Sequence, residues 1–540
     1  MNLLASIANT AWLSSGLPAW RNFRRALNRP RETQLAHLRQ LLTANSDCAF
    51  GRAHRFERIG NYDEFARHVP LLTTEELSDW VARIQKGETR LLTREPVTQL
   101  LPTSGTSSGR KLIPFTAGLQ KEFNNAIGPW MVDLARQFPL LIGGPAYWSV
   151  TPIAQAETEK DLPVPIGFED DSAYLGGLRR GLVNAAMAVP GTVRHVREVD
   201  VFRRLVLLYL LRCEDLRLIS VWHPSFLTLL LDAIKTHWEA LLLDIERGGF
   251  HAAEVLEDSV RAQALRLRPN RKRSAYLRTI GPHDYHRIWP TLCLVSCWSD
   301  GHARFAAAEL EQKLRPISIQ AKGLLSTEAF VSFPFGGHFP VAVTSHFFEF
   351  IDERGRISLL TDLRLGEQYE VIVTTRGGLW RYRTGDRIEV VSFLGQTPSI
   401  RFLGRVGCVS DRFGEKLSDA FVAESLNQLF SGKIAAPRFA MLAPQENAYH
   451  QWHYTLFFDG PFTPDILSNL EDLLRANPHY AYCRDLGQLS ALRLFKIERD
   501  AFKTYLHAET ERGLRIGDVK PVALSLRVDW STRFFGSYVD

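Results

Sequence analysis

Short apolar runs alternate with helical patterns along the middle of the chain, and this alternation restricts the possible folds more than any other feature. Between about Pro102 and Phe402, β-like runs such as AYWSVTPI, LCLVSCW and YEVIVTT are separated by helical stretches such as TAGLQKEFNNAIGPWMVDLARQF and ARFAAAELEQKL. Strands that alternate with helices pair in parallel, because each helix returns the chain to the same end of the sheet. We therefore predict a large α/β domain with parallel or mixed sheets.

The segments before this region read as helices. Residues 73–76 (TTEE) form a capping box that opens LSDWVARIQK, and Gly87 ends that helix. The N-terminus, MNLLASIANTAWLSSGLPAWRNFRRAL, resembles an amphipathic helix more than a signal peptide, because Asn9, Ser14 and Pro18 interrupt its apolar stretch. Contact of this helix with a membrane surface stays an open alternative.

The pattern changes near Leu403. A Gly-containing loop leads to a helix capped by Ser418, and the strand-like segments RFAMLAP and WHYTLFF follow, with a helix in PDILSNLEDLLRANP. A unit of this size can fold as its own domain. We predict an N-terminal domain of residues 1–403 and a smaller α+β C-terminal domain of residues 404–540.

The charge and hydropathy of the chain argue against a nucleic-acid partner and against insertion into a membrane. The formal net charge is only +6 over 540 residues, and we interpret the densest basic run, residues 268–273, as a solvated loop rather than a nucleic-acid contact. No uninterrupted apolar stretch reaches the roughly 18 residues that span a bilayer. We therefore expect no nucleic-acid partner and no stable membrane insertion.

The 6 Cys residues show neither a CxxC pair nor a zinc-type spacing. Cys293 and Cys297 fall on one face of a β-like run, which indicates buried free thiols. Free thiols favour a reducing compartment. We expect a cytoplasmic protein and, as its assembly state, a monomer.

The strongest local signal is the segment PTSGTSSGRKLIPF, residues 102–115. Gly, Ser and Thr allow backbone N–H groups and hydroxyls to converge on phosphate oxygens, while Lys or Arg neutralises their charge. The glycine spacing differs from that of a Walker A loop. An ordinary connection before a strand is the alternative interpretation.

Three later segments add groups that nucleotide chemistry needs. Glu328 follows two hydroxyl residues and could ligate Mg²⁺. Asp386 follows a Gly turn and could accept both hydroxyls of a ribose. Lys416 and Lys520 could balance charge where carboxylate meets phosphate. Taken one at a time, a turn Asp, a helix-cap Glu and a surface Lys are equally ordinary explanations.

In their order, these motifs resemble those of the auxin-responsive acyl acid–amido synthetases, a family of the adenylate-forming superfamily, which also holds acyl-CoA ligases and luciferases. The resemblance rests on TSGTSSGRKLIPF, STEA, YRTGD and FLGR with GEK, and it extends to the early CAFGRAHRF and YDEFARHVPLLT. The chain departs from the family pattern at Thr327, where Ser is frequent, and at Ala329, where Gly is common. It also has GDVKP where the family usually has Gln before an aromatic–Lys pair.

The resemblance implies an adenylate-forming N-terminal domain that binds ATP and an acyl acid, and a mobile C-terminal domain. The residues that it assigns to ATP binding are Ser104, Gly105, Thr106, Ser107, Ser108, Gly109, Lys111, Thr327, Glu328, Asp386 and Arg405. Glu328 would also lie beside Mg²⁺, and Arg405 near the interdomain hinge. Lys416 and Lys520 would be the catalytic residues and would take turns at the active site.

A third set of residues concerns the acyl acid. Trp222, Pro224, Ser225 and Phe226 occupy a stretch that lines the acyl pocket in members of the family, although the start of a core helix explains them equally well. His338 and His346 have no Cys or acidic partners at ligand spacing, so we interpret them as structural.

The reaction that the resemblance implies has two steps and uses ATP and Mg²⁺. A carboxylate attacks the α-phosphorus to give acyl-AMP and pyrophosphate, and the amine of an amino acid or another amine then displaces AMP. Two alternatives stay open: an acyl-CoA ligase with a thiol acceptor, and a non-catalytic nucleotide-binding protein.

Overall fold

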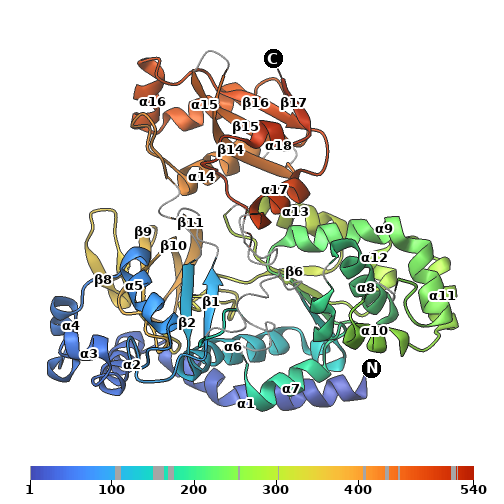
Figure 1. The fold of residues 1–540 in the computed structure, drawn as a ribbon, viewed down its shortest axis with the longest axis horizontal. Coiled ribbons are helices and arrows are strands. Elements are labelled where there is room, and N and C mark those ends of the chain that lie inside the picture. The colour runs from blue at the N-terminus through green and yellow to red at the C-terminus, as the bar shows by residue number, and fades with distance from the viewer. Residues whose placement is uncertain are drawn as a thin grey trace.

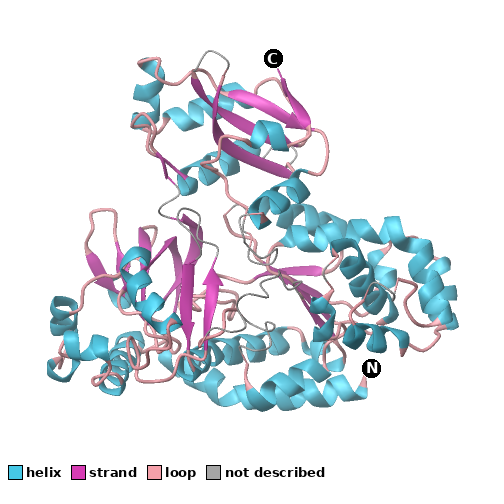
Figure 2. Cartoon of the chain, viewed as in Figure 1, coloured by secondary structure: helices cyan, strands magenta, loops and turns pink. Residues whose placement is uncertain are grey.

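The computed structural model describes residues 2–103, 111–149, 163–167, 175–196, 198–252, 256–301, 303–405, 409–431, 437–447, 451–511, 519 and 521–539. Helices surround several groups of strands, and the C-terminal residues, orange to red in Figure 1, gather in a unit of their own (Figures 1 and 2). Among the described residues no helix is long and apolar enough to cross a membrane.

The N-terminal region is helical, as predicted. The capping box is present: the Thr73 hydroxyl accepts from the Glu76 amide, and the Glu76 carboxylate accepts from the Thr73 amide at 2.7 Å. Its helices are α1 (Leu3–Ala26), α2 (Pro30–Ala44), α3 (Ala49–Ala53), α4 (Tyr62–His68) and α5 (Thr74–Gln85).

Two glycines bring α1 against α6 (Ala117–Gln137). A Cβ on Gly16 would lie 3.1 Å from the Val132 side chain and 3.3 Å from the Gly128 carbonyl oxygen. The two helix backbones can approach this closely because neither glycine carries a side chain. The long N-terminal helix thereby covers the helix that follows the predicted phosphate segment.

A parallel sheet confirms the interpretation of the alternating pattern. Its strand order is β3-β4-β5-β6, and every neighbouring pair is parallel. The strands are β3 (Ala146–Trp148), β4 (Leu218–Ser220), β5 (Leu294–Cys297) and β6 (Ser318–Ala321). Helices between them include α8 (Val199–Arg212), α9 (Pro224–Arg247) and α13 (Ala303–Leu314), and α9 begins at the predicted proline.

A second sheet is antiparallel, with the order β11-β10-β9-β7-β8. Its strands are β7 (Phe347–Ile351), β8 (Ile357–Leu359), β9 (Gln368–Thr374), β10 (Tyr382–Leu394) and β11 (Thr397–Arg405). The sequence YEVIVTT, which we counted with the parallel strands, forms β9 here. It pairs antiparallel with β7 and with β10, and no α-helix lies between β7 and β10 to return the chain for a parallel pairing.

The C-terminal residues build a four-stranded sheet, β14-β15-β16-β17, with a hydrophobic cluster on each face. Its elements are α14 (Asp419–Phe430), β14 (Phe439–Glu446), β15 (Trp452–Asp459), α15 (Ile466–Arg475), α16 (Pro478–Asp485), β16 (Arg493–Ile497), α17 (Ala501–Thr510), α18 (Trp530–Arg533) and β17 (Gly536–Val539). Ser418 caps α14, as predicted. The boundary that we predict between residues 403 and 404 falls inside β11.

The basic run at residues 268–273 is the expected solvated loop only in part: its first half is a loop and Arg268, Arg271 and Lys272 are exposed. Asn270 caps α11 (Arg271–Arg278), and the side chain of Arg273 is buried, where it donates to the carbonyls of Leu211 and Ile288. The remaining elements are α7 (Gly177–Ala185), α10 (Asp258–Leu265), α12 (Tyr285–Ile288), the pair β12 (Val409–Ser410) and β13 (Leu417–Ser418), and 3-10 turns at Phe56–Arg58, Pro139–Gly143, Gly191–His195 and Leu360–Asp362.

Candidate active site

A hairpin frames the predicted phosphate-binding segment. β1 (Gln99–Thr103) pairs antiparallel with β2 (Lys111–Phe115), and Thr103 lies opposite Lys111. Six residues assigned to the ATP phosphates lie outside the described residues and stay a prediction: Ser104, Gly105, Thr106, Ser107, Ser108 and Gly109. The pairing holds the two ends of this segment beside each other, and Lys111 is the first residue of β2.

Lys111 and Glu328 form a buried ion pair. The Lys111 Nζ lies 2.6 Å from Glu328 Oε1, and the two side chains are 9% and 1% exposed. The same Nζ lies 4.7 Å from the centre of the Tyr382 ring, and the Tyr382 hydroxyl is hydrogen-bonded to that of Thr74 at 2.9 Å. Half-buried Thr327 precedes Glu328 in the same bend. The ion pair thus joins the segment PTSGTSSGRKLIPF to the segment STEA. Tyr382, which belongs to the motif YRTGD, lies beside this pair.

The electrostatic surroundings keep this pair charged. Burial by itself raises the pKa of Glu328, but the charges of Lys111 and Arg405 and the hydrogen bond from Lys111 outweigh it and lower that pKa to about 2. Burial lowers the pKa of Lys111, whereas Glu328 and Tyr382 raise it, and the net direction is upward. Both groups are therefore ionised at neutral pH.

Asp386 and Arg405 lie opposite each other on β10 and β11. Arg405 Nε donates to Asp386 Oδ1 at 3.1 Å, and Asp386 is 1% exposed. The Gly turn before Asp386 is a distortion inside a strand: Gly385 has φ +77°, and the pairing with β9 shifts register between Arg383 and Arg387. Because glycine tolerates this conformation, the strand can bend and turn the carboxylate of Asp386 inward.

Two carboxylate oxygens at this site have no hydrogen-bond donor within the described part of the chain: Glu328 Oε2 and Asp386 Oδ2, both buried. An unsatisfied buried acceptor is costly unless a ligand satisfies it. The fit with nucleotide is chemical: Oε2 suits a hard cation such as Mg²⁺, and Oδ2 suits a ribose hydroxyl. No group of three or more His, Cys, Asp or Glu side chains able to hold a metal occurs among the described residues.

The two predicted catalytic lysines lie beyond β11. Lys416 is exposed and has φ +46°, and Asn477 Nδ2 donates to its carbonyl oxygen at 3.2 Å. Neighbouring Glu415 is buried and accepts from the amides of Arg412 and Phe413 and from the Tyr454 hydroxyl. The GEK motif is thus a tight turn that presents Lys416 to solvent, and the structure does not bring its side chain to Glu328.

Lys520 lies outside the described residues, but the chain that follows it is anchored. The Asp419 carboxylate accepts from the amides of Ala523 and Leu524 at 2.8 and 2.9 Å, and the Leu442 amide donates to the Ala523 carbonyl. Burial raises the pKa of Asp419 to about 6. The C-terminal sheet therefore holds the segment after Lys520 beside the start of α14.

The four residues predicted to line an acyl pocket lie in different surroundings. Trp222 follows β4 at the carboxyl edge of the parallel sheet, with its ring 5.4 Å from that of Trp298. Pro224 and Ser225 are buried in the first turn of α9, and Phe226 lies 6.0 Å from Phe502 of α17. Phe226 therefore contacts the C-terminal unit, and only Trp222 faces the edge where ligands bind in parallel sheets.

One further residue at that edge escaped the sequence analysis. Lys322 follows β6, is 3% exposed, and donates to Ser220 Oγ at 2.6 Å. Its Nζ also lies 5.2 Å and 5.4 Å from the ring centres of Trp130 and Trp222. A lysine directly after the short strand β6, whose sequence is SIQA, was the available signal, because residues after parallel strands line the ligand edge.

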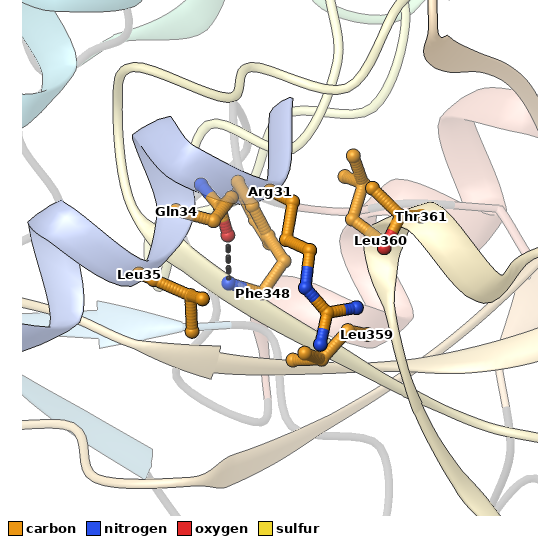
Figure 3. A pocket seen from close by; sticks show the side chains of 7 residues that line it. All are labelled: Arg31, Gln34, Leu35, Phe348, Leu359, Leu360 and Thr361. Atoms are coloured by element: carbon orange, nitrogen blue, oxygen red, sulfur yellow. Dashed lines mark hydrogen bonds between the residues drawn. The ribbon is translucent and has the colours of Figure 1, made fainter. Parts of the chain in front are cut away.

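A separate pocket beneath β7 is too small for a nucleotide. Figure 3 shows it lined by Arg31, Gln34, Leu35, Phe348, Leu359, Leu360 and Thr361, and its volume is about 10 Å³. This is about the space of one water molecule. Gln34 in its wall accepts a hydrogen bond from the Phe348 amide, which ties α2 to the sheet.

Comparison with solved structures shows the same fold. An acyl acid amido synthetase named GH3.15 superposes with a TM-score of 0.82 at 17% sequence identity, covering 96% of each chain. Its complex with 2,4-DB gives a TM-score of 0.83, covering 97% of each chain. The described arrangement, including the C-terminal unit, is thus that of a known two-domain enzyme fold.

Sequence comparison agrees over most of the chain. A probable indole-3-acetic acid-amido synthetase of Oryza sativa subsp. japonica is 23% identical, over 96% of this chain and 89% of the relative. A jasmonoyl–L-amino acid synthetase of Nicotiana attenuata is 23% identical, over 82% of each. The GH3 family N-terminal domain matches residues 19–315, and the GH3 family central domain matches residues 339–405. The chain belongs to the GH3 family.

Proposed function

We propose that this protein is an ATP-dependent acyl acid–amido synthetase. It activates a small carboxylic acid as acyl-AMP, with release of pyrophosphate, and transfers the acyl group to the amine of an amino acid or of another small molecule. The observation that carries the proposal is the union of Lys111, Glu328 and Asp386 at one buried site. The chain's relatives, a probable indole-3-acetic acid-amido synthetase and a jasmonoyl–L-amino acid synthetase, support it.

The residues at this site have separable tasks. Glu328 would hold Mg²⁺, which supplies positive charge to the phosphate oxygens of ATP. Lys111 adds a fixed positive charge beside the phosphate segment, and Asp386 orients the ribose through its free oxygen. No covalent enzyme intermediate is needed, so positioning and charge stabilisation account for catalysis.

The second half of the proposal concerns the C-terminal unit, residues 404–540. We propose that it changes orientation between the half-reactions, with Lys520 serving adenylation and Lys416 serving the alternative orientation. The exposure of Lys416 supports this proposal, because a side chain in solvent can enter the site only when the unit moves. We propose in addition that the protein is cytoplasmic, in keeping with the five free cysteines among its described residues, and that it is a monomer.

The experiment that tests the function is pyrophosphate exchange. With ATP and Mg²⁺, a panel of aryl, indolyl and aliphatic acids is expected to contain members that stimulate exchange of labelled pyrophosphate into ATP. Product analysis with amino acids, CoA and hydroxylamine then identifies the acceptor. An acyl-CoA product would replace this proposal by the ligase alternative, and ATP binding without any exchange would favour a non-catalytic protein.

A further inference from the structure

A buried carboxylate outside the motifs lies at the centre of the N-terminal domain. Glu122, on α6, is 1% exposed. His37 Nε2 lies 2.9 Å from its Oε1, His346 Nδ1 lies 3.1 Å from its Oε2, and the Arg376 amide donates to Oε2 at 2.9 Å. A charge is retained in an apolar core only when donors surround it in this way.

The hydrogen bonds of His346 fix its tautomer. Its Nε2 accepts from the Phe330 amide at 3.1 Å, so this nitrogen carries no hydrogen. The ring hydrogen therefore lies on Nδ1, which donates to Glu122. The Phe123 ring packs edge-on against the rings of Phe330 and His346, at distances between ring centres of 6.0 Å and 5.6 Å. The imidazole thus connects the carboxylate on α6 to the backbone two residues beyond Glu328.

The same carboxylate is linked to three segments that supply or hold site residues. α6 follows β2, which begins at Lys111. Arg376 stands in the turn between β9 and β10, and β10 carries Asp386. The segment with Glu328 is held through His346. Glu122 is therefore a common anchor of three chain segments that are far apart in sequence.

We propose that His346 and Glu122 are positioning residues for Glu328. They hold the Phe330 amide, and with it the bend at residues 326–329, so that one oxygen of Glu328 meets Lys111 and the other, Oε2, would be available to Mg²⁺. The inference rests on the proposed function for the Mg²⁺ role of Glu328. Neither residue touches the reacting groups.

Two nearly isosteric variants of His346 separate the two hydrogen bonds. The amide of His346→Gln can reach the place of Nε2 and accept from Phe330, whereas His346→Asn reaches only the place of Nδ1 and the carboxylate of Glu122. His338→Asn is the matched control, since His338 bonds the Ser392 hydroxyl instead. Calorimetry measures ATP binding with and without Mg²⁺, and amide hydrogen exchange measures the opening of residues 326–332.

The Asn variant is expected to exchange faster in residues 326–332 and to bind ATP with Mg²⁺ about tenfold more weakly, the low end for groups that orient a metal ligand. Its affinity for ATP without Mg²⁺ is expected to be unchanged. The Gln variant keeps the acceptor for the Phe330 amide but loses the bond to Glu122, so it is expected to lie between the Asn variant and the unmodified protein in both measurements. The control is expected to match the unmodified protein.

The positioning role is overturned if Asn and Gln behave alike, or if the Asn variant loses the same affinity with and without Mg²⁺. If Mg²⁺ fails to strengthen ATP binding even in the unmodified protein, the proposed function loses its metal site. The exchange of residues 326–332 then decides the positioning role alone, so the two failures remain distinguishable.

Discussion

Burial makes the charged residues of the site depend on one another. Glu328, Lys111 and Asp386 are nearly inaccessible to water, and each has an opposite charge within hydrogen-bond distance. Removing one partner of such a pair leaves a buried charge without compensation, which costs more than the pair itself contributes. Substitutions here are therefore expected to act on stability as well as on binding, and the tests must separate the two effects.

The low pKa of Glu328 predicts a dependence of stability on pH. Its folded-state pKa of about 2 is below the ordinary 4.5, so its stabilising contribution is present above pH 4.5 and is lost as the pH falls towards 2. Between pH 5 and 3 the free energy of unfolding is expected to lose about 2 kcal/mol from this group alone. Glu328→Gln should lack this part of the slope in urea unfolding. Identical slopes would show that Glu328 titrates normally.

The free oxygen of Asp386 predicts its role in ATP binding. A hydrogen bond to a charged group contributes about 1.5–3 kcal/mol, so Asp386→Ala is expected to weaken ATP binding about ten- to a hundredfold. Loss of the partner of Arg405 could also reduce affinity. Comparison of ATP with 3′-deoxy-ATP separates the causes: the unmodified protein should discriminate between them, and the variant should not. Equal discrimination by the two proteins would show that Asp386 acts only by pairing with Arg405.

The pairing of neighbouring strands places these residues at the site. The register of β1 with β2 brings Lys111 to the end of the phosphate segment, and that of β10 with β11 sets Asp386 opposite Arg405. Helix α5 also supports the site, because the hydroxyl of Thr74 in its first turn is hydrogen-bonded to the hydroxyl of Tyr382. The stability of this first turn consequently matters for the site.

The capping box of α5 provides a test at this scale. Thr73→Ala removes the hydroxyl that accepts from the Glu76 amide, and such caps contribute about 1 kcal/mol. The amides of residues 74–77 are expected to exchange about fivefold faster, the equivalent of that energy, if they exchange by local opening. Thr73→Ser keeps the acceptor and is expected to behave as the unmodified protein. Unchanged exchange in the Ala variant would show that packing alone holds the turn.

In the whole molecule, aromatic contacts between described residues join the C-terminal unit to the N-terminal domain. Phe502 of α17 stacks on His223, with ring centres 5.5 Å apart, and Phe305 of α13 packs against Phe430 of α14. Figure 1 shows α17 beside α9 and α13. A change of orientation would have to break these aromatic contacts, and His223 lies within the stretch predicted to line the acyl pocket.

The proposed change of orientation predicts a separation of the half-reactions. Lys520→Ala is expected to reduce pyrophosphate exchange by about 10²–10³, the effect of one preorganised charge, while conjugation from supplied acyl-AMP survives. Lys416→Ala is expected to spare exchange relative to conjugation. Lys496→Ala, an exposed lysine on β16, is the matched control and should affect neither step. Equal loss of both steps in Lys520→Ala would contradict a role confined to adenylation.

The sequence alone determined the α/β class, the capping box, the cap of α14 and the motifs that contain the site residues, because local periodicity and turn chemistry specify these features. Only the tertiary structure decided which motifs meet. Lys111 and Glu328 are 217 residues apart, and no local pattern encodes their contact. The same reason explains why the antiparallel pairing of β9, the buried Arg273 and the anchor at Glu122 were not predicted: each depends on neighbours that folding supplies from distant parts of the chain.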